Sequence, residues 1–90
     1  MATMHLRAKG RVQGVGFRWF VRVAARRLQL SGWVKNAADG SVEIAASGPE
    51  DKLAELRKLI ARGPDGAEVS EVLEVEGDTS EVEYPFAMRR

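Results

Sequence analysis

The stretch GRVQGVGFR, residues 10–18, joins a predicted strand to a predicted helix. Before it, residues 4–9 alternate between apolar and polar side chains, which is typical of a short strand. Glycines at positions 10, 14 and 16 predict a loop, and Gly32 marks the end of the helical unit. Five apolar residues at helical spacing predict a helix of about three to four turns: Phe17, Phe20, Val21, Ala24 and Leu28.

A hairpin is predicted next. Residues 33–36 begin a second strand, and the Asp39-Gly40 pair within residues 38–41 favours a tight turn. Val42, Ile44 and Ala46 alternate beyond the turn, as in a strand with one buried face. We therefore expect the second and third strands to pair through this turn.

A second helix follows the hairpin. Its start has two interpretations: Ser47 and Glu50 have capping-box spacing, or Gly48 caps a helix whose first residue is Pro49. Gly63-Pro64 ends it. Four apolar residues form its predicted buried face: Leu53, Leu56, Leu59 and Ile60.

The last third of the chain is rich in glutamate. Val69, Leu73 and Val75 predict a fourth strand, and we expect the glutamates at positions 68, 71, 74 and 76 to line its solvent-exposed face. Further on, Pro85 interrupts an alternating segment. Because proline cannot donate to the ladder, any strand there lies at an edge of the sheet or has Pro85 among its first residues. That segment carries Tyr84, Phe86 and Met88.

The predicted order is strand, helix, strand, strand, helix, strand. This is the ferredoxin-like βαββαβ arrangement of the α+β class, in which two helices cover one face of an antiparallel sheet. Ninety residues suit a single domain, residues 1–90. Many enzymes and binding modules share this arrangement, so the fold alone does not give the function.

Composition excludes several classes of protein. The chain has no cysteine and one histidine, His5, which argues against a disulfide scaffold, a cysteine nucleophile or a zinc site. No apolar run approaches the roughly 20 residues of a membrane span, and no signal peptide is recognisable. We therefore expect a cytoplasmic protein without a metal and without membrane association.

Charge is distributed unevenly. Residues 1–38 contain eight Lys or Arg and no acidic residue, whereas residues 39–90 contain six basic and thirteen acidic residues. A basic N-terminal half indicates an anionic ligand, either nucleic acid or a small phosphate compound. Equally, the two halves can interleave in the fold and pair their charges on the surface.

The loop at residues 10–18 is suited to holding a phosphate. Glycines let a ligand approach the backbone closely, and amides at a helix N-terminus attract anions. Arg18 lies at that N-terminus, where its planar guanidinium can bind a phosphate through two hydrogen bonds. The simpler interpretation is a tight turn that merely requires glycine. The spacing fits neither a Walker A loop nor a dinucleotide-binding loop.

Asn36 is the only asparagine of the chain and lies on the second predicted strand. A carboxamide both donates and accepts hydrogen bonds, so it can orient a water molecule for attack. Phosphoryl transfer depends mainly on positioning and charge stabilisation, so such a residue can suffice without a strong base. The alternative is an asparagine that makes local backbone bonds in the hairpin.

Taken together, the two segments resemble the acylphosphatase family. The stretch at residues 10–18 is similar to the first signature of that family. Residues 32–36, GWVKN, followed by Gly40, Val42 and Gly48, are similar to the second signature at its full spacing. The resemblance covers essentially the whole chain, and the family has a ferredoxin-like fold.

The resemblance implies a function and a site. The activity is hydrolysis of the carboxyl-phosphate bond of a small acyl phosphate by direct in-line attack of water, with no metal or cofactor. Arg18 binds the phosphoryl group and stabilises its charge, and Asn36 positions the water. The backbone of the loop from Gln13 through Gly14, Val15, Gly16 and Phe17 to Arg18 wraps the phosphate. We expect a monomer, and the physiological acyl phosphate stays open.

Two alternatives carry other predictions. A ferredoxin-like RNA-binding module would use aromatic residues beside arginines, such as Trp19 and Trp33, for stacking. However, we find no aromatic-rich strand like the RNA-recognition signature, so we expect no nucleic acid partner and partly buried tryptophans. A phosphate-binding accessory domain is the second alternative, because domains similar to acylphosphatase also occur inside larger carbamoyl-transfer proteins.

Overall fold

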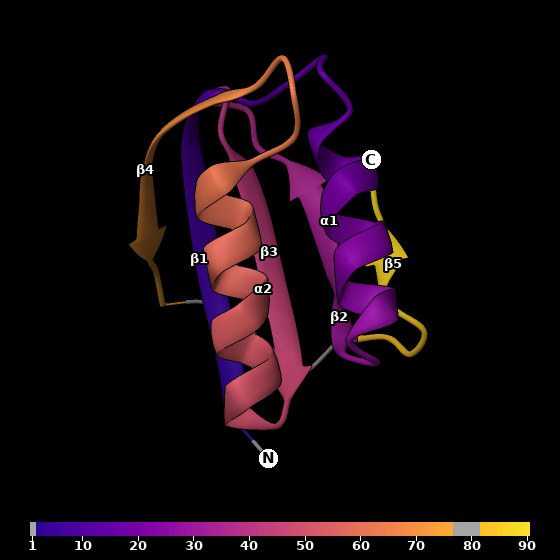
Figure 1. Cartoon of the computed structure of the whole chain (residues 1–90). Helices are drawn as coiled ribbons and strands as arrows, with labels where there is room; N and C mark the ends of the chain where they lie inside the picture. Colours follow the sequence, from indigo (N-terminus) through magenta and orange to yellow (C-terminus); the bar gives the residue numbers. More distant parts are fainter. Residues whose placement is uncertain (1, 77–81) are drawn as a thin grey trace.

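The structure, a computed structural model, describes residues 2–76 and 82–90. Two helices and five strands follow one another along this part of the chain (Figure 1). In order they are β1 (Ala2–Arg11), α1 (Phe17–Arg27), β2 (Ser31–Asn36), β3 (Val42–Gly48), α2 (Glu50–Arg62), β4 (Glu68–Glu74) and β5 (Ala87–Met88).

The strands form one sheet in the order β4-β1-β3-β2-β5. Strands β1 and β3 pair antiparallel at the centre, with β4 beside β1 and β2 beside β3. Both helices lie on the same face of the sheet (Figure 1). The predicted ferredoxin-like α+β fold is therefore confirmed. The short strand β5 adds one parallel pairing, Trp33 with Ala87 and Val34 with Met88, which makes the sheet mixed.

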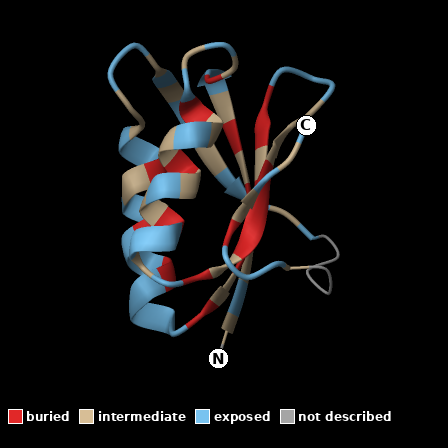
Figure 2. Cartoon of the chain, turned by 90° about the vertical axis from the view of Figure 1, so that its right-hand side faces the viewer, coloured by how far each residue is buried: buried red, intermediate tan, exposed pale blue. Residues whose placement is uncertain are grey.

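The core lies between the helices and the sheet (Figure 2). Alternate residues of the strands, such as Leu6, Val34 and Ile44, point into it and are fully buried. Helix α1 contributes Val21 and Ala25 at helical spacing. Helix α2 contributes three of its four predicted apolar residues, Leu53, Leu56 and Ile60. The fourth, Leu59, is half-buried.

The start of α2 differs from both sequence interpretations. Gly48 still belongs to β3, and Pro49 is the N-cap residue in an extended conformation, with φ −61° and ψ 143°. No side chain caps the helix, so the predicted capping box does not form. Glu50 and Asp51 in the first turn instead complement the positive end of the helix dipole. Pro49 suits this position because the first amides of a helix have no partner within it.

Other boundaries shift as well. Strand β1 extends the predicted strand at both ends, and β2 begins at Ser31, so Gly32 lies inside a strand. In β4 the pairing with β1 shifts register between Lys9 and Gly10. This bulge explains why Val69 and Val72 pack against the core while Leu73 is exposed.

The C-terminal segment is fastened to α1 and β2. Phe86 is fully buried in the core. Its carbonyl accepts a hydrogen bond of 2.8 Å from Nε of Arg26, at the end of α1. The predicted edge strand is confirmed, but only over Ala87–Met88.

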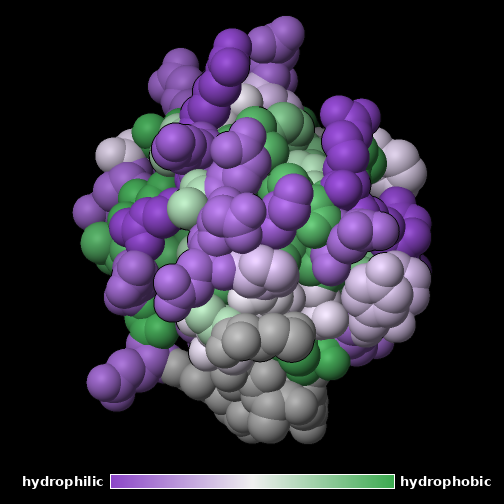
Figure 3. All heavy atoms as spheres, turned by 60° about the horizontal axis from the view of Figure 1, so that its bottom comes forward, coloured by the Kyte–Doolittle hydropathy of each residue, from purple (hydrophilic) through white to green (hydrophobic). Residues whose placement is uncertain are grey.

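Figure 3 shows that hydrophilic side chains cover much of the end of the molecule opposite the loop at residues 12–16, with smaller hydrophobic areas between them. Within the described ranges, neither helix has the length and apolar character that crossing a bilayer requires.

Candidate functional site

The loop between β1 and α1 leaves the first amides of α1 uncapped by any side chain. Val12 and Phe17, at its two ends, are buried and anchor it to the core. Between them Gly14 and Gly16 adopt left-handed backbone angles, with φ 75° and 76°. An added Cβ at either position would meet no neighbouring atom within 4 Å, so it is the backbone conformation that requires glycine here.

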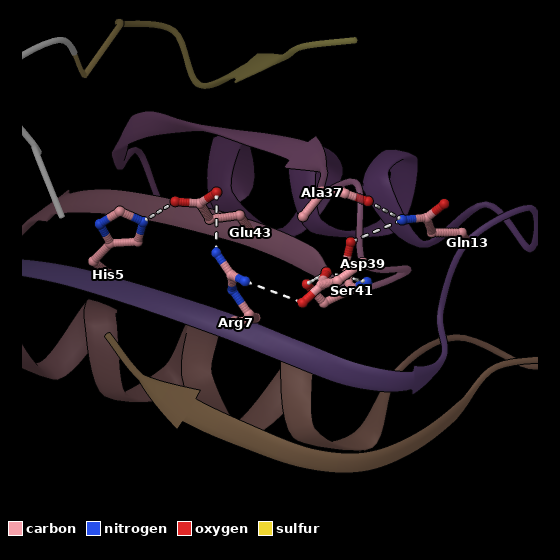
Figure 4. Close-up of polar contacts among 7 residues, drawn as sticks. All are labelled: His5, Arg7, Gln13, Ala37, Asp39, Ser41 and Glu43. Carbon is pink, nitrogen blue, oxygen red and sulfur yellow. Dashed lines mark hydrogen bonds and ion pairs between the residues drawn. The ribbon is translucent and has the colours of Figure 1, made fainter. Parts of the chain in front are cut away.

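Gln13 ties this loop to the β2–β3 hairpin. Its Nε2 donates hydrogen bonds of 2.9 Å to the carbonyl of Ala37 and of 2.9 Å to the carbonyl of Ser41 (Figure 4). Ala37 directly follows Asn36, the last residue of β2. The side chain of Gln13 therefore brings the loop beside the end of β2, a role that sequence reasoning missed.

Asn36 sits at that end of β2, opposite Val42 of β3. Its side chain is half-buried. The carboxamide forms no hydrogen bond with any of the described residues. The alternative prediction, that Asn36 makes local backbone bonds in the hairpin, is therefore wrong. The carboxamide is therefore available to a ligand or a water molecule.

Arg18 lies in the first turn of α1 and reaches the C-terminal segment. Its Nη1 donates a hydrogen bond of 2.7 Å to the carbonyl of Arg89. The amide of Arg89 in turn donates one of 2.7 Å to the carbonyl of Val34, two residues before Asn36 on β2. The structure thus places the guanidinium of Arg18 along the edge of β2 that leads to Asn36.

The surroundings of Arg18 favour an anion. The first turn of α1 contains no acidic residue, and within residues 2–76 and 82–90 no carboxylate forms an ion pair with Arg18. Arg18 belongs to the first turn of α1, so its positive charge adds to the positive end of the helix dipole. A cation at a helix N-terminus opposes the dipole, so an anion between the two stabilises both.

A second polar cluster lies on the sheet face opposite the helices (Figure 4). Nε2 of His5 contacts Oε2 of Glu43 at 2.5 Å, and Nη2 of Arg7 lies 3.7 Å from Oε1 of Glu43. Nη1 of Arg7 also donates to Asp39 at 3.1 Å. These bonds join β1, β3 and the hairpin turn, because residues at alternate positions of paired strands share a face.

The same cluster holds the hairpin turn. Hydrogen bonds from the hydroxyl and then the amide of Ser41, together with the charge of Arg7, lower the pKa of Asp39 from 3.8 to about 2. The carboxylate is therefore ionised at neutral pH and braces the turn that Gln13 contacts. In the part of the chain that the structure describes, no three His, Asp or Glu side chains gather as a metal site would require.

The predicted site residues thus fall in one region. Asn36 lies at the same end of the sheet as the loop from Gln13 to Arg18, and the side chain of Gln13 joins the two segments. The two tryptophans differ from expectation. Trp33 is only 4% exposed, while Trp19 is 57% exposed rather than partly buried.

This fold and this site define a small α+β domain with an uncapped helix N-terminus suited to phosphate. The family model for acylphosphatase matches residues 4–88. The chain is 47% identical over 87 residues to an acylphosphatase of Pseudomonas aeruginosa, covering 97% of this chain and 94% of that protein. It is 57% identical over 63 residues to an acylphosphatase of Koribacter versatilis, covering 70% of this chain and 57% of that one.

Solved structures agree. The crystal structure of acylphosphatase from Bacillus subtilis superposes with a TM-score of 0.91 at 38% identity, covering 100% of both chains. A crystal structure of T. kodakarensis HypF also matches, with a TM-score of 0.84 at 28% identity, but the match covers only 12% of that chain. The chain belongs to the acylphosphatase family, and these relatives support an enzyme with acylphosphatase function.

Proposed function

We propose that this chain hydrolyses acyl phosphates at the loop from Gln13 to Arg18, with Arg18 and Asn36 as its catalytic residues. One observation carries the proposal. The N-terminus of α1 has no side-chain cap, the guanidinium of Arg18 is held at the edge of β2, and the carboxamide of Asn36 at the end of that strand has no partner among the described residues. A phosphate fits the first two groups, and a water molecule fits the third.

In this mechanism the backbone amides of residues 13–18 bind the phosphoryl oxygens, and Arg18 neutralises the charge that they carry in the transition state. The carboxamide of Asn36 orients the attacking water. The water oxygen forms a bond to phosphorus while the bond from phosphorus to the carboxylate oxygen breaks. The bonding pair leaves with the carboxylate, and a phosphate oxygen takes the proton of the water. The products are a carboxylate and inorganic phosphate.

Neither the loop nor α1 contains an acidic residue that could serve as a general base, and in the proposed reaction the substrate's own phosphate fills that role. We propose that the reaction needs no metal and no cofactor. We further propose that the protein acts in the cytoplasm as a monomer, with a small acyl phosphate as its only partner and neither nucleic acid nor membrane involved.

The test is hydrolysis of benzoyl phosphate in the presence of EDTA by the wild type and by Asn36→Ala. We expect rapid turnover by the wild type and loss of turnover in the variant. Inorganic phosphate should still bind the variant, because the loop and Arg18 are intact. Asn36→Asp is a matched control of nearly equal size. It keeps the acceptor oxygen and replaces the amide donor with a second acceptor, and its charge repels the phosphate.

Three results would contradict the proposal. A folded wild-type protein that leaves benzoyl phosphate intact rules out the activity. Unchanged turnover by Asn36→Ala rules out the role of Asn36, while turnover that stops with EDTA rules out metal independence. Circular dichroism of each variant separates a lost function from a lost fold.

A further inference from the structure

A groove of about 620 Å³ runs between the two helices. Its volume lies within the range of roughly 300–1,000 Å³ that is usual for small-molecule sites. Its walls are mostly apolar and come from α1, α2 and the segment after α2: Trp19, Phe20, Val23, Ala24, Leu59 and Pro64.

The groove is continuous with the loop between β1 and α1, which is the proposed phosphate site. Gly16 lines the groove and is also the N-cap residue of α1. Helix α1 begins at the end of the molecule where α2 finishes (Figure 1), so Gly16 and Pro64 mark one end of the groove. Arg27 and Glu55 lie toward the other end. An occupant that starts at the loop therefore meets apolar walls first and charged groups last.

Part of this apolar lining is uncovered. The exposed fractions of Trp19 and Val23 are 57% and 36%, although both belong to the helix face that lines the groove. The guanidinium carbon of Arg22 lies 4.7 Å from the centroid of the Trp19 ring, a cation–π contact that holds the indole at the rim. A ligand in the groove would bury these side chains and gain hydrophobic stabilisation.

In the proposed mechanism, the leaving carboxylate departs toward the groove. In-line attack places the leaving group opposite the attacking water. Asn36, which orients that water in the proposed mechanism, lies in the sheet, and α1 lies over the sheet (Figure 1). The carboxylate therefore departs on the side away from the sheet, where Gly16 and Trp19 open the groove.

We propose that this groove binds the acyl group of the substrate, and that the preferred substrates are acyl phosphates with a large apolar acyl group. This rests on the proposed function, because it takes the loop beside Gly16 as the phosphate site. A small acyl group, as in acetyl phosphate, leaves Trp19 and Val23 uncovered. A large apolar group covers them and brings binding energy to the reaction from outside the reacting centre.

The experiment compares kcat/KM for acetyl phosphate and for 4-phenylbutanoyl phosphate, whose carboxylate leaving groups have similar basicity. The measured quantity is the ratio of the two values. The ratio for the wild type should favour the larger substrate. In Trp19→Ala and in Val23→Lys it should fall by about tenfold or more, since apolar contacts in a pocket discriminate by about this factor.

Leu73→Ala is the matched control, since Leu73 is a similarly exposed apolar residue on β4 that does not line the groove. Its ratio should equal that of the wild type. If both substrates are hydrolysed and the ratio is the same in Trp19→Ala, Val23→Lys and the wild type, the groove is not the acyl site and the proposed function stands. If the folded wild type hydrolyses neither substrate, both proposals fail.

Discussion

Nη1 of Arg18 donates a hydrogen bond of 2.7 Å to the main-chain carbonyl of Arg89, 71 residues later in the sequence. A guanidinium in a first helical turn has many rotamers, and this bond selects one of them. The selected rotamer lies beside β2, because the amide of Arg89 is bonded to the carbonyl of Val34. The last residues of the chain therefore help to set the geometry of the candidate site.

Removing residues 89 and 90 should lower kcat/KM for acetyl phosphate by up to about 100-fold, the effect expected when a catalytic group is misplaced by about 1 Å. The matched control is Arg89→Ala, which keeps the carbonyl that Arg18 contacts and loses the ion pair of the Arg89 side chain with Glu83. Steady-state kinetics should show a much smaller loss for this variant. Equal losses in both would show that the side chain of Arg89 matters, not its carbonyl.

Arg18→Ala should reduce kcat/KM by about 10²–10³-fold, the usual effect of removing a group that stabilises transition-state charge. Arg18→Lys keeps the charge but not the planar fork, so we expect an intermediate loss. Inhibition by inorganic phosphate should weaken in the same order. Normal turnover by Arg18→Ala, checked on purified folded protein, would remove Arg18 from the mechanism.

Gln13→Ala should destabilise the fold by about 1–2 kcal/mol, because each lost hydrogen bond to Ala37 or Ser41 contributes about 1 kcal/mol. Turnover should also fall, since the loop is no longer held beside Asn36. Urea unfolding and steady-state kinetics measure the two effects. Gln13→Glu has nearly the same volume but no amide donor. It should be at least as damaging, and a neutral outcome would mean that packing, not hydrogen bonding, holds the loop.

Two glycines of the first strand-loop-helix unit should respond differently to alanine. At Gly14 the added methyl group meets open space, so only the left-handed backbone costs energy, about 1–2 kcal/mol. At Gly10 the added atom would lie 2.1 Å from the carbonyl oxygen of Glu68 on β4, in addition to an unfavourable φ of 123°. Strain and clash together should cost about 2–5 kcal/mol. Denaturant unfolding of the two variants compares them directly, and equal losses would contradict this difference.

Asp39 should stabilise the protein in a pH-dependent way. Its pKa is lowered from 3.8 to about 2, so the unfolded chain takes up the proton first as the pH falls. The stabilisation is complete above about pH 5 and disappears between about pH 4 and pH 2. The difference in free energy of unfolding between the wild type and Asp39→Asn should therefore be larger at pH 6 than at pH 2.5. A difference that does not change with pH would show that the ionised carboxylate does not brace the turn.

Much of the fold follows from local patterns. The apolar spacing of α1 and the Asp39-Gly40 turn were sufficient to predict a helix and a hairpin, because both depend on neighbours a few residues apart. Both interpretations of the start of α2 were wrong, because Gly48 belongs to β3 and Pro49 is itself the N-cap residue, with no side-chain cap. The prediction that Trp19 is partly buried was wrong. Periodicity places a residue on a helix face but does not show whether a neighbour covers that face.

The sequence by itself determined the classes of chemistry that are open to this protein. It specified a glycine loop before a helix, an arginine at the start of that helix, a single asparagine on the next strand and no cysteine. Tertiary structure decided which groups meet. The bonds of Gln13 to the hairpin and of Arg18 to Arg89 join residues at least 24 positions apart. Local spacing cannot specify such contacts, because they exist only once the sheet has brought distant segments together and loop closure has been compensated by burial of the core.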